Sequence, residues 1–380
     1  MRAAAPHFCI LNALVSAFHT IIVGLGGMGS AAAAHLAARG VRVLGLEQFQ
    51  PAHSHGSSHG RSRVIRLAYF EHPAYVPLLR RSFELWRRLE IDSGRVVLQM
   101  TGGLMLGAPD SEVVSGSLRS ARAHDLAHEL LEAPEIRRRF PPLTPSAGTV
   151  ALYEHEAGSL FPEDGIRAHL NMAGRAGAQL HFDERVEDWH VTASGSIDVV
   201  TGRSHYTCER LILSPGAWAS ALFKLAWLPL EVEPQRLYWF RPEGGAAPFA
   251  PDRFPIYIWD LGGNVQFYGF PADAGQRVKV AFFRSAKIDE ATMRDVLEPC
   301  IPALARGTLV DAVSCKYTLT PDHHFVIDHH PDHPEVVIAS PCSGHGYKFA
   351  TVIGEILADL AIDGVTRHPI DLFAVSRFRH

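Results

Sequence analysis

The sequence predicts an α/β protein in which a Rossmann-like domain is interrupted by a second, β-rich domain. Three observations support this fold class: a strand–glycine turn–helix–strand pattern at the start of the chain, a similar pattern near its end, and short alternating strands between them. The 380 residues exceed what one hydrophobic core usually supports, which favours two domains. Hydrophobic residues make up 47% and charged residues 20%, which is typical of a globular chain rather than a disordered or fibrous one.

The first pattern is a βαβ unit that ends at Glu47. Its elements follow one another closely: a β-branched strand at 20–23, a glycine turn at 24–29, an alanine-rich helix at 30–39 and a second strand at 41–46. Gly40 follows the helix directly, at the position where a glycine commonly ends one. The unit is short enough to be a single supersecondary motif.

The glycine turn has the spacing of a dinucleotide-binding motif. Gly24 permits the tight turn, Gly26 lets the backbone approach a pyrophosphate, and Gly29 lets the helix pack closely against the strand. Glu47 ends the second strand, where its carboxylate can accept hydrogen bonds from ribose hydroxyls, and an acid there argues against NADP. The spacing alone leaves NAD and FAD open. A glycine-rich turn in an unrelated α/β protein is the competing interpretation.

The remaining elements continue the α/β pattern. A polar loop at 51–63 leads into the segment 64–66, and apolar residues at 75–89 have helical spacing. Four short runs predict neighbouring strands of one sheet: 238–240, 256–259, 265–270 and 278–283. The second α/β pattern consists of a strand at 336–339, a glycine loop at 343–348 and a helix at 349–362 that ends before Gly364.

Charge and cysteine content argue against several classes of function. A net charge of −4 gives no electrostatic basis for binding nucleic acid or an anionic membrane surface. The histidine-rich stretch 323–333 lacks the spacing of metal ligands, so no metal is expected. The 5 cysteines have irregular spacing, which favours reduced thiols and a cytoplasmic location: Cys9, Cys208, Cys300, Cys315 and Cys342.

Residues 1–17 are expected to form a short N-terminal extension. No charged residue occurs from 3 to 38, but polar residues and glycines interrupt this stretch, so it does not predict a membrane span. Residues 8–18 have some likeness to a signal-peptide core with only Arg2 as its basic region. Secretion is the less favoured interpretation, because the predicted fold begins immediately afterwards.

Five separated motifs identify a family. They are the glycine turn, His-Gly-Ser-Ser-His-Gly-Arg-Ser-Arg-Val-Ile-Arg at 55–66, Tyr-Gly-Phe-Pro at 268–271, Cys-Lys-Tyr-Thr-Leu-Thr-Pro-Asp at 315–322 and Ser-Gly-His-Gly-Tyr-Lys-Phe at 343–349. Together they closely resemble the monomeric sarcosine oxidase and N-methyltryptophan oxidase family, which are FAD-dependent amine oxidases of the D-amino acid oxidase fold. The likeness runs from about residue 18 to the C-terminus.

The resemblance implies a domain organisation and an activity. An FAD-binding domain would comprise 18–95, 160–227 and 315–380, and a substrate domain with a large mixed β-sheet would comprise 96–159 and 228–314. The activity implied is oxidation of a secondary, N-methyl amino acid at its C–N bond to an imine, with O₂ reduced to H₂O₂. The expected partners are therefore the small-molecule amine and O₂, and a monomer is expected.

The resemblance also implies that FAD is covalently attached. Cys315 matches the family's cysteine that joins the flavin 8α-methyl group through a thioether, a bond that a thiolate-type nucleophile readily forms. Further positions match FAD-binding residues of the family: Gly24, Gly26, Met28, Gly29, Glu47, His59, Ser62, Arg63, Gly216, Gly344, Gly346 and Lys348.

Five residues are expected to carry the chemistry. Arg66 and Lys348 match the pair that holds the substrate carboxylate, which needs compensating positive charge in a water-poor pocket. Lys279 matches the lysine implicated in activating O₂, where a positive charge would stabilise superoxide as it forms. Tyr268 and Tyr317 match residues close to the substrate. No general base is named, because the flavin accepts the hydride equivalent.

The substrate pocket is expected to contain two departures from the family pattern besides Arg66, Lys348 and Tyr268. Phe283 stands where sarcosine oxidases of this family have a histidine, and Trp259 stands where a smaller apolar side chain is typical. Both changes make the pocket more aromatic and less polar. We therefore expect a larger or more apolar N-methyl amino acid to be preferred over sarcosine.

Three alternatives to an oxygen-using amine oxidase remain at this point. A flavin dehydrogenase of the same fold would pass electrons to another acceptor, but Lys279 favours oxygen. A non-catalytic FAD-binding protein would not need Arg66 and Lys348. An NAD dehydrogenase has support only from the glycine turn.

Overall fold

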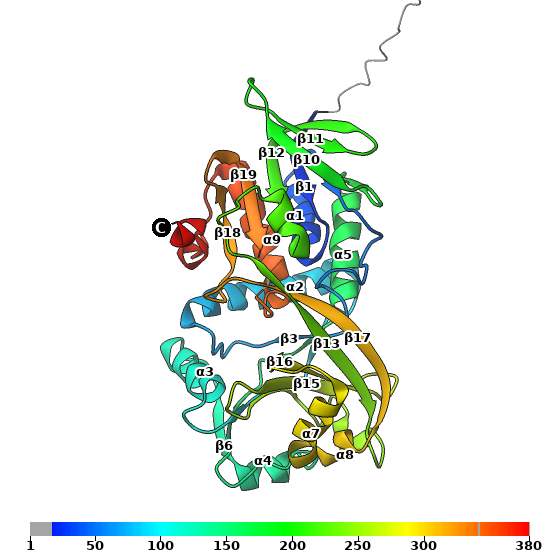
Figure 1. Ribbon diagram of the computed structural model, residues 1–380, viewed down its shortest axis with the longest axis vertical. Coiled ribbons are helices and arrows are strands. Elements are labelled where there is room, and N and C mark those ends of the chain that lie inside the picture. Colours follow the sequence, from blue (N-terminus) through cyan, green and yellow to red (C-terminus); the bar gives the residue numbers. More distant parts are fainter. Residues whose placement is uncertain (1–16, 341–342, 380) are drawn as a thin grey trace, which may run out of the picture.

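The computed structural model of the chain describes residues 17–340 and 343–379. The expected N-terminal extension therefore lies outside the described residues, apart from Ala17, which begins the first strand. Figure 1 shows two large sheets, one in each half of the molecule, with helices packed on both. The predicted fold class, a Rossmann-like half joined to a half with a large mixed sheet, is confirmed.

The first sheet contains the predicted βαβ unit. It is 8-stranded and is formed by β1 (Ala17–Val23), β2 (Val43–Leu46), β9 (Gln179–His181), β10 (Val186–Val191), β11 (Ile197–Thr201), β12 (His205–Leu213), β18 (Val326–His330) and β19 (His333–Ser340). At its centre β1 pairs in parallel with β2 and with β12, and β12 pairs in parallel with β19. The segments that pair at the centre are apolar without alternation because both faces of a parallel sheet are buried: 21–23, 211–213 and 336–338.

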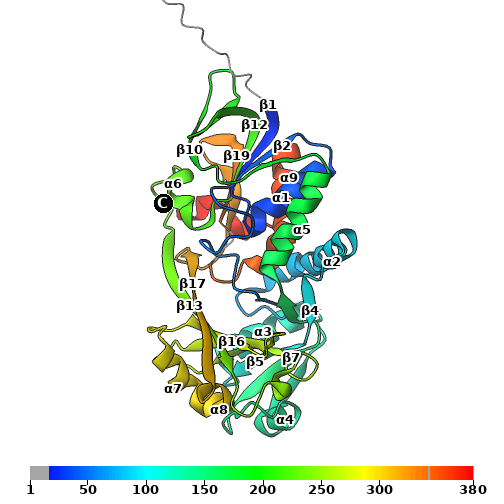
Figure 2. The same cartoon turned by 90° about the vertical axis from the view of Figure 1, so that its right-hand side faces the viewer.

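Three helices cover this sheet, and a fourth packs against two of them. They are α1 (Gly27–Ala38), α5 (Pro162–Arg175), α9 (Ala350–Asp363) and α2 (Val76–Ser93). Helix α1 packs against both α5 and α9, as Figure 2 shows from the side. Gly354 permits the close approach of α9, because a Cβ there would lie 2.5 Å from the Cβ of Ala31. Helix α9 ends as predicted at Gly364, which has a φ of 73°.

The second sheet contains the four runs predicted to be neighbours. Its 8 strands follow the order β17-β13-β16-β15-β14-β5-β7-β6, which confirms that prediction. The strands are β5 (Gly103–Gly107), β6 (Glu129–Glu132), β7 (Val150–Glu154), β13 (Glu231–Arg241), β14 (Ile256–Asp260), β15 (Gln266–Ala272), β16 (Val278–Arg284) and β17 (Thr308–Leu319). Among these described neighbours, β5 and β14 pair in parallel and the other pairs are antiparallel, so the sheet is mixed.

Smaller elements complete the two halves. Four helices lie along its sheet: α3 (Glu112–Ala123), α4 (Ala133–Arg139), α7 (Glu290–Cys300) and α8 (Pro302–Ala305). A 3-stranded sheet of β3 (Arg63–Ile65), β8 (Gly158–Leu160) and β4 (Leu98–Met100) lies between the halves, and α6 (Ala219–Leu222) is a single turn. The domain boundaries remain a prediction. The one expected between 314 and 315 falls inside β17, which with β13 spans both halves in Figure 1.

The two faces of the second sheet belong to different cores. Leu237, Trp239, Ile258 and Tyr268 join the core shared with the Rossmann-like half. Their strand neighbours face the opposite way and pack with α7 and α8 in a separate core: Tyr238, Phe240, Tyr257, Trp259 and Phe267. Because successive side chains of a strand point to opposite faces, only the first set can reach a site between the halves.

The described helices contain no segment long and apolar enough to cross a membrane.

The histidines at 329 and 330 have structural hydrogen bonds instead of metal-ligand geometry. His329 Nε2 contacts the carbonyl oxygen of Gly364 at 3.0 Å, and His330 Nε2 contacts that of Phe223 at 3.0 Å. Both rings therefore tie loops to neighbouring elements.

Candidate active site

Two adjoining cavities form one continuous site that begins in the Rossmann-like half and reaches the second sheet. The first, here called the cradle cavity, is lined by Gly24, Gly26, Glu47 and Gly216 among others. The second, the inner cavity, brings together most of the residues expected at the reaction centre: Arg63, Arg66, Tyr268, Phe283, Tyr317, Gly344, Gly346 and Lys348. Met28, Ser57 and Ser58 line both cavities, so the two are continuous.

The glycine turn has the geometry of a cradle. Gly24 has a φ of 89°, and a Cβ there would meet the carbonyl oxygen of Ser214 at 2.6 Å. A Cβ on Gly29 would lie 1.8 Å from the carbonyl oxygen of Gly24, so only glycine lets α1 start this close to β1. At Gly26 the nearest atom, Ser58 Oγ, is 4.0 Å away, which leaves room for a ligand. Helix α1 begins there without a side-chain cap from Gly26, and its Gly27 N–H donates to Ser58 Oγ at 3.4 Å.

Glu47 is held in place by the turn itself. Its Oε2 accepts a hydrogen bond from the Leu25 N–H at 2.8 Å, and its Oε1 accepts one from the Phe49 N–H at 3.1 Å. A carboxylate has lone pairs for further bonds, and this one lines the cradle cavity. It can therefore receive ribose hydroxyls while keeping the turn in shape. Gly216, with a φ of 58°, lines the same cavity.

Arg66 enters the inner cavity as half of a buried ion pair. Its side chain is 1% exposed, and Nη2 lies 2.6 Å from Oε2 of Glu71. Nη1 donates to the carbonyl oxygen of Ala68 at 2.7 Å, whereas Nε has no hydrogen-bond partner among the described residues. Burial opposes ionisation of Glu71, but the charges of Arg66, His345 and Lys348 together hold its pKa below the ordinary value. Sequence reasoning missed Glu71.

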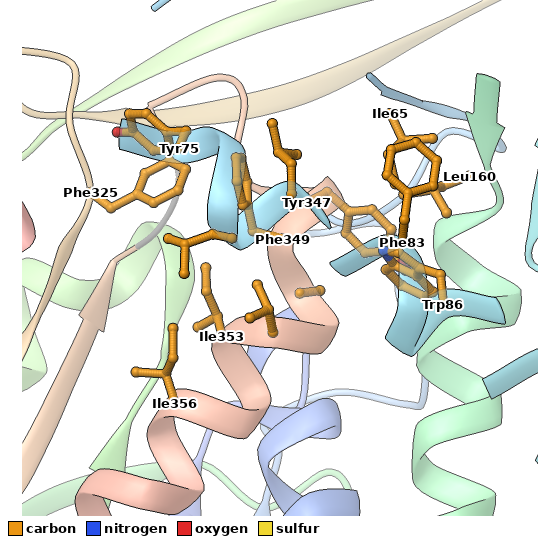
Figure 3. Close-up of a cluster of buried hydrophobic side chains, with 14 of the residues drawn as sticks. Ile65, Tyr75, Phe83, Trp86, Leu160, Phe325, Tyr347, Phe349, Ile353 and Ile356 are labelled. Carbon is orange, nitrogen blue, oxygen red and sulfur yellow. The ribbon is translucent and has the colours of Figure 1, made fainter. Parts of the chain in front are cut away.

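Lys348 is directed into the cavity by its neighbours in the chain. Tyr347 and Phe349 are buried in the core on either side, as Figure 3 shows, and Trp86 Nε1 donates to the Lys348 carbonyl oxygen at 2.9 Å. Nζ donates to the carbonyl oxygen of His345 at 2.6 Å. Burial, followed by the charge of Arg66, lowers the pKa of Lys348 to about 7. The protonation state of the Lys348 side chain therefore changes near neutral pH.

Cys315 lies directly behind the cavity wall. Its Sγ is 3.7 Å from the carbonyl oxygen of Ser57, and Arg63 Nη2 donates to the same sulfur at 3.6 Å. Both Ser57 and Arg63 line the inner cavity. The buried sulfur thus lies against two residues of the cavity wall, one of which carries a positive charge.

Lys279 lies in a third cavity, not in the inner one. This outer cavity is also lined by Ser62, Trp239 and Phe270. Nζ donates to the carbonyl oxygens of Gly60 at 2.8 Å and Ser62 at 2.7 Å. Burial, with Arg63 nearby, lowers the pKa of Lys279 well below its ordinary value. The structure therefore separates this lysine from the Arg66 and Lys348 pair.

His59 lines none of these three cavities. It is buried, and burial together with the charge of Arg63 lowers its pKa to about 4. Its Nε2 has no hydrogen-bond partner within the part of the chain that the structure describes. Like Nε of Arg66, this nitrogen is a buried polar atom next to the site that a ligand or water would satisfy.

The expectation that Trp259 lines the pocket is wrong. Trp259 faces the separate core of the second sheet, where its ring stacks on Phe267 with centroids 5.9 Å apart. Ile258, the preceding residue of β14, lines the inner cavity instead, together with Tyr268 and Phe283. The reason is the alternation of side chains along a strand, which a shift of one residue reverses.

The aromatic wall of the inner cavity contains a residue that sequence reasoning missed. Phe70 lines the cavity and contacts Phe283 edge-to-face, with ring centroids 6.0 Å apart. Gly344, with a φ of 77°, lies next to this wall: a Cβ there would come within 2.9 Å of the Tyr317 ring and 3.3 Å of the Phe283 ring. A glycine is therefore needed to keep this part of the wall open.

The described residues fit FAD. The cradle leaves open space at Gly26 for a pyrophosphate, Glu47 offers acceptors for a ribose, and the joined cavities lead to Arg63 and the sulfur of Cys315. The unpartnered Nε of Arg66 marks the inner end of the site as polar and water-poor. A long dinucleotide with a planar ring at its inner end matches this arrangement.

Comparison with known sequences agrees with this geometry. A family model described as "FAD dependent oxidoreductase" matches residues 19–360. The chain is 50% identical over 372 residues to the monomeric sarcosine oxidase of Streptomyces avermitilis, covering 94% of this chain and 96% of that protein. It is 30% identical over 375 residues to the N-methyl-L-tryptophan oxidase of Salmonella dublin, with 95% and 99% covered.

Solved structures share the fold at lower sequence identity. The L-proline dehydrogenase from P. horikoshii superposes with a TM-score of 0.84 at 22% identity, covering 96% of this chain and 99% of that chain. The glycine oxidase from Geobacillus kaustophilus gives a TM-score of 0.79 at 21% identity, with 95% and 99% covered.

Proposed function

The chain belongs to the FAD-dependent oxidoreductase family, and from this premise we propose that it oxidises the C–N bond of an N-methyl amino acid to an imine, with O₂ reduced to H₂O₂. One observation carries the proposal: the buried side chains of Arg66 and Lys348 line the same cavity as an aromatic wall, beside the sulfur of Cys315. Two cations in a water-poor cavity suit a carboxylate. The names of the relatives, a sarcosine oxidase and an N-methyl-L-tryptophan oxidase, support the same substrate class.

Each residue has a role in this proposal. FAD, when bound, supplies the two-electron acceptor. Arg66 and Lys348 bind the substrate carboxylate, and Tyr268 and Tyr317 line the cavity where the amine would lie. Lys279, buried in the outer cavity, offers a positive charge to O₂ as O₂ gains negative charge.

The preferred substrate is proposed to be larger or more apolar than sarcosine. Phe283 and Phe70 present aromatic surface to the inner cavity, and Ile258 extends it. Sarcosine has no side chain to cover this surface, whereas an apolar side chain would remove it from water. A monomer is also proposed, since a relative is named a monomeric sarcosine oxidase. A reducing compartment such as the cytoplasm is proposed because Cys208 and Cys300 are free thiols within the described chain.

Anaerobic mixing tests the activity directly. The purified protein is mixed without O₂ with sarcosine, N-methyl-leucine or N-methyl-phenylalanine, and the flavin absorbance is followed. Loss of the yellow colour followed by one H₂O₂ per amine on admitting O₂ supports the proposal. No bleaching with any amine contradicts it, and bleaching without oxygen consumption would indicate a dehydrogenase. Equal or better turnover of sarcosine would contradict only the proposed preference.

The Cys315→Ser variant is expected to lose the covalent flavin entirely. The serine hydroxyl is a far weaker nucleophile than the thiol that lies against Ser57 and Arg63, so the thioether cannot form. After denaturing precipitation, the yellow colour should stay with the wild-type protein and pass to the supernatant for the variant. Cys208→Ser is the matched control, because that buried thiol lies in another core. Loss of colour from the wild-type pellet would contradict the role of Cys315.

Binding of a simple carboxylate is expected to weaken as the pH rises above about 7, the lowered pKa of Lys348. Below this pH, Arg66, protonated Lys348 and ionised Glu71 sum to one positive charge, and above it they sum to zero. Each further pH unit should lower the affinity by up to about tenfold. Titration of the flavin spectrum with propanoate at pH values on both sides of the pKa measures this. Lys348→Met should bind weakly at every pH, and an unchanged pH dependence in that variant would contradict the assignment.

A further inference from the structure

We propose that Phe70 selects the side chain of the substrate, as part of a rigid apolar wall that favours N-methyl amino acids with an apolar side chain over sarcosine. The inference rests on the proposed function and names the residue and the structural support that set its specificity. It also assigns a role to α3, a helix outside the cavity.

Phe70 lies next to the residue that would hold the carboxylate. The Arg66 guanidinium carbon is 4.4 Å from the centroid of the Phe70 ring, and both side chains are 1% exposed. In an α-amino acid the carboxylate and the side chain branch from the same carbon. A carboxylate bound to Arg66 therefore brings the side chain within reach of Phe70 and of Phe283, whose ring meets that of Phe70 at an interplanar angle of 82°.

The segment that carries Phe70 is held by its backbone from outside the cavity. Oε2 of Glu154, at the end of β7, accepts hydrogen bonds from the N–H groups of Leu67 at 3.2 Å and Ala68 at 2.9 Å. Ser120 on α3 donates through Oγ to the carbonyl oxygen of Tyr69 at 2.5 Å. Three consecutive residues before Phe70 are thus anchored to two different elements.

Gly116 on α3 fixes the position of Phe70 itself. A Cβ at residue 116 would meet the Phe70 carbonyl oxygen at 2.6 Å and the Phe70 Cβ at 2.9 Å. These atoms belong to the backbone or adjoin it, so they cannot move aside as the end of a flexible side chain would. Phe70 therefore cannot retreat toward α3 to enlarge the cavity, and its ring is a fixed surface against which a substrate side chain packs.

The expected energetic effect follows from burial of apolar surface. Covering the wall with a leucine-sized side chain should favour binding by about 10- to 100-fold relative to a substrate that leaves it exposed. Phe70 is itself 1% exposed, so its ring acts by supporting the more exposed ring of Phe283, and replacing it with alanine lets the wall recede from the substrate. The preference for the larger substrate should then fall, whereas a ring that merely limited the space would produce the opposite change.

The first experiment compares the wild-type holoenzyme with Phe70→Ala and Phe70→Leu. The ratio of kcat/KM for N-methyl-leucine to that for sarcosine should fall at least tenfold in Phe70→Ala and by an intermediate factor in Phe70→Leu. An unchanged or increased ratio overturns the proposal. Inhibition constants for 4-methylpentanoate and acetate, which carry the two skeletons without an amine, should change in the same direction. They test the wall even if no N-methyl amino acid reduces the wild-type flavin, which would contradict the proposed function alone.

The second experiment tests the support from α3. Gly116→Ala should push the Phe70 backbone toward the cavity and change the substrate ratio at least threefold. Gly174→Ala is the matched control, because that glycine also lies in a helix but has nothing within 4 Å of its added Cβ. A Gly116→Ala enzyme that folds, binds FAD and keeps the wild-type ratio overturns the role assigned to α3.

Discussion

Lys279→Met is expected to slow the reaction of the reduced enzyme with O₂ by about 10²- to 10³-fold, the usual effect of removing one preorganised charge-stabilising group. Reduction by the amine should change little, because Lys279 lies in the outer cavity and not in the inner one. Burial and Arg63 lower the pKa of Lys279 well below its ordinary value, so its ammonium is poorly stabilised until a negative charge forms nearby.

The pH dependence provides an independent check on this lysine. The protonated form is the one that stabilises negative charge, so the oxygen reaction of the wild-type enzyme should slow as the pH rises through the lowered pKa of Lys279. Stopped-flow mixing of the anaerobically reduced enzyme with O₂ measures both effects. Lys279→Arg should retain part of the rate, and Lys287→Met, at an exposed lysine, is the control. Equal losses in amine reduction and in the oxygen reaction would contradict a role specific to oxygen.

Arg66→Met is expected to lower kcat/KM for an N-methyl amino acid by about 10²- to 10³-fold, because truncating a buried, hydrogen-bonded charge commonly costs 2–5 kcal/mol in binding. The substitution should also destabilise the fold by about 3–5 kcal/mol, since it leaves the carboxylate of Glu71 buried without its partner. Steady-state kinetics and denaturant unfolding measure the two effects separately.

A double variant separates binding from stability. Arg66→Met with Glu71→Gln removes the unpaired carboxylate and should recover much of the stability, but not the affinity for the substrate. A substrate whose carboxylate is esterified should lose little activity in either variant. If the double variant regained wild-type kcat/KM, Arg66 would be a structural ion pair and not the carboxylate site.

Much of the fold was predictable because its signals are local. The turn from Gly24 to Gly29, the helix after it and the strand that ends at Glu47 are adjacent in the chain, and their periodicity changes where the structure changes. The four runs in the middle were also identified as neighbouring strands. The runs at 256–259, 265–270 and 278–283 pair in sequence order, as strands close in sequence commonly do, whereas the run at 238–240 pairs with the last of them.

The wall of the site was less predictable. Arg66, Lys348 and Tyr268, which come from three of the motifs, occupy one cavity with Phe283, but Trp259 was assigned to it wrongly. Successive side chains of a strand point to opposite faces of the sheet. An assignment shifted by one position therefore places a core residue in the cavity wall.

Local sequence determined the cofactor cradle and identified the cations Arg66 and Lys348. In both cases the side-chain chemistry and the backbone shape are set within a few consecutive residues. Tertiary packing alone decided the partner of Arg66, the exclusion of Lys279 from the inner cavity and the rigidity of Phe70. Glu154 lies 86 residues from Ala68 and Gly116 lies on a separate helix, yet both hold the same segment. Such contacts depend on how α3 and β7 pack, and no periodicity within either element encodes the distance between them.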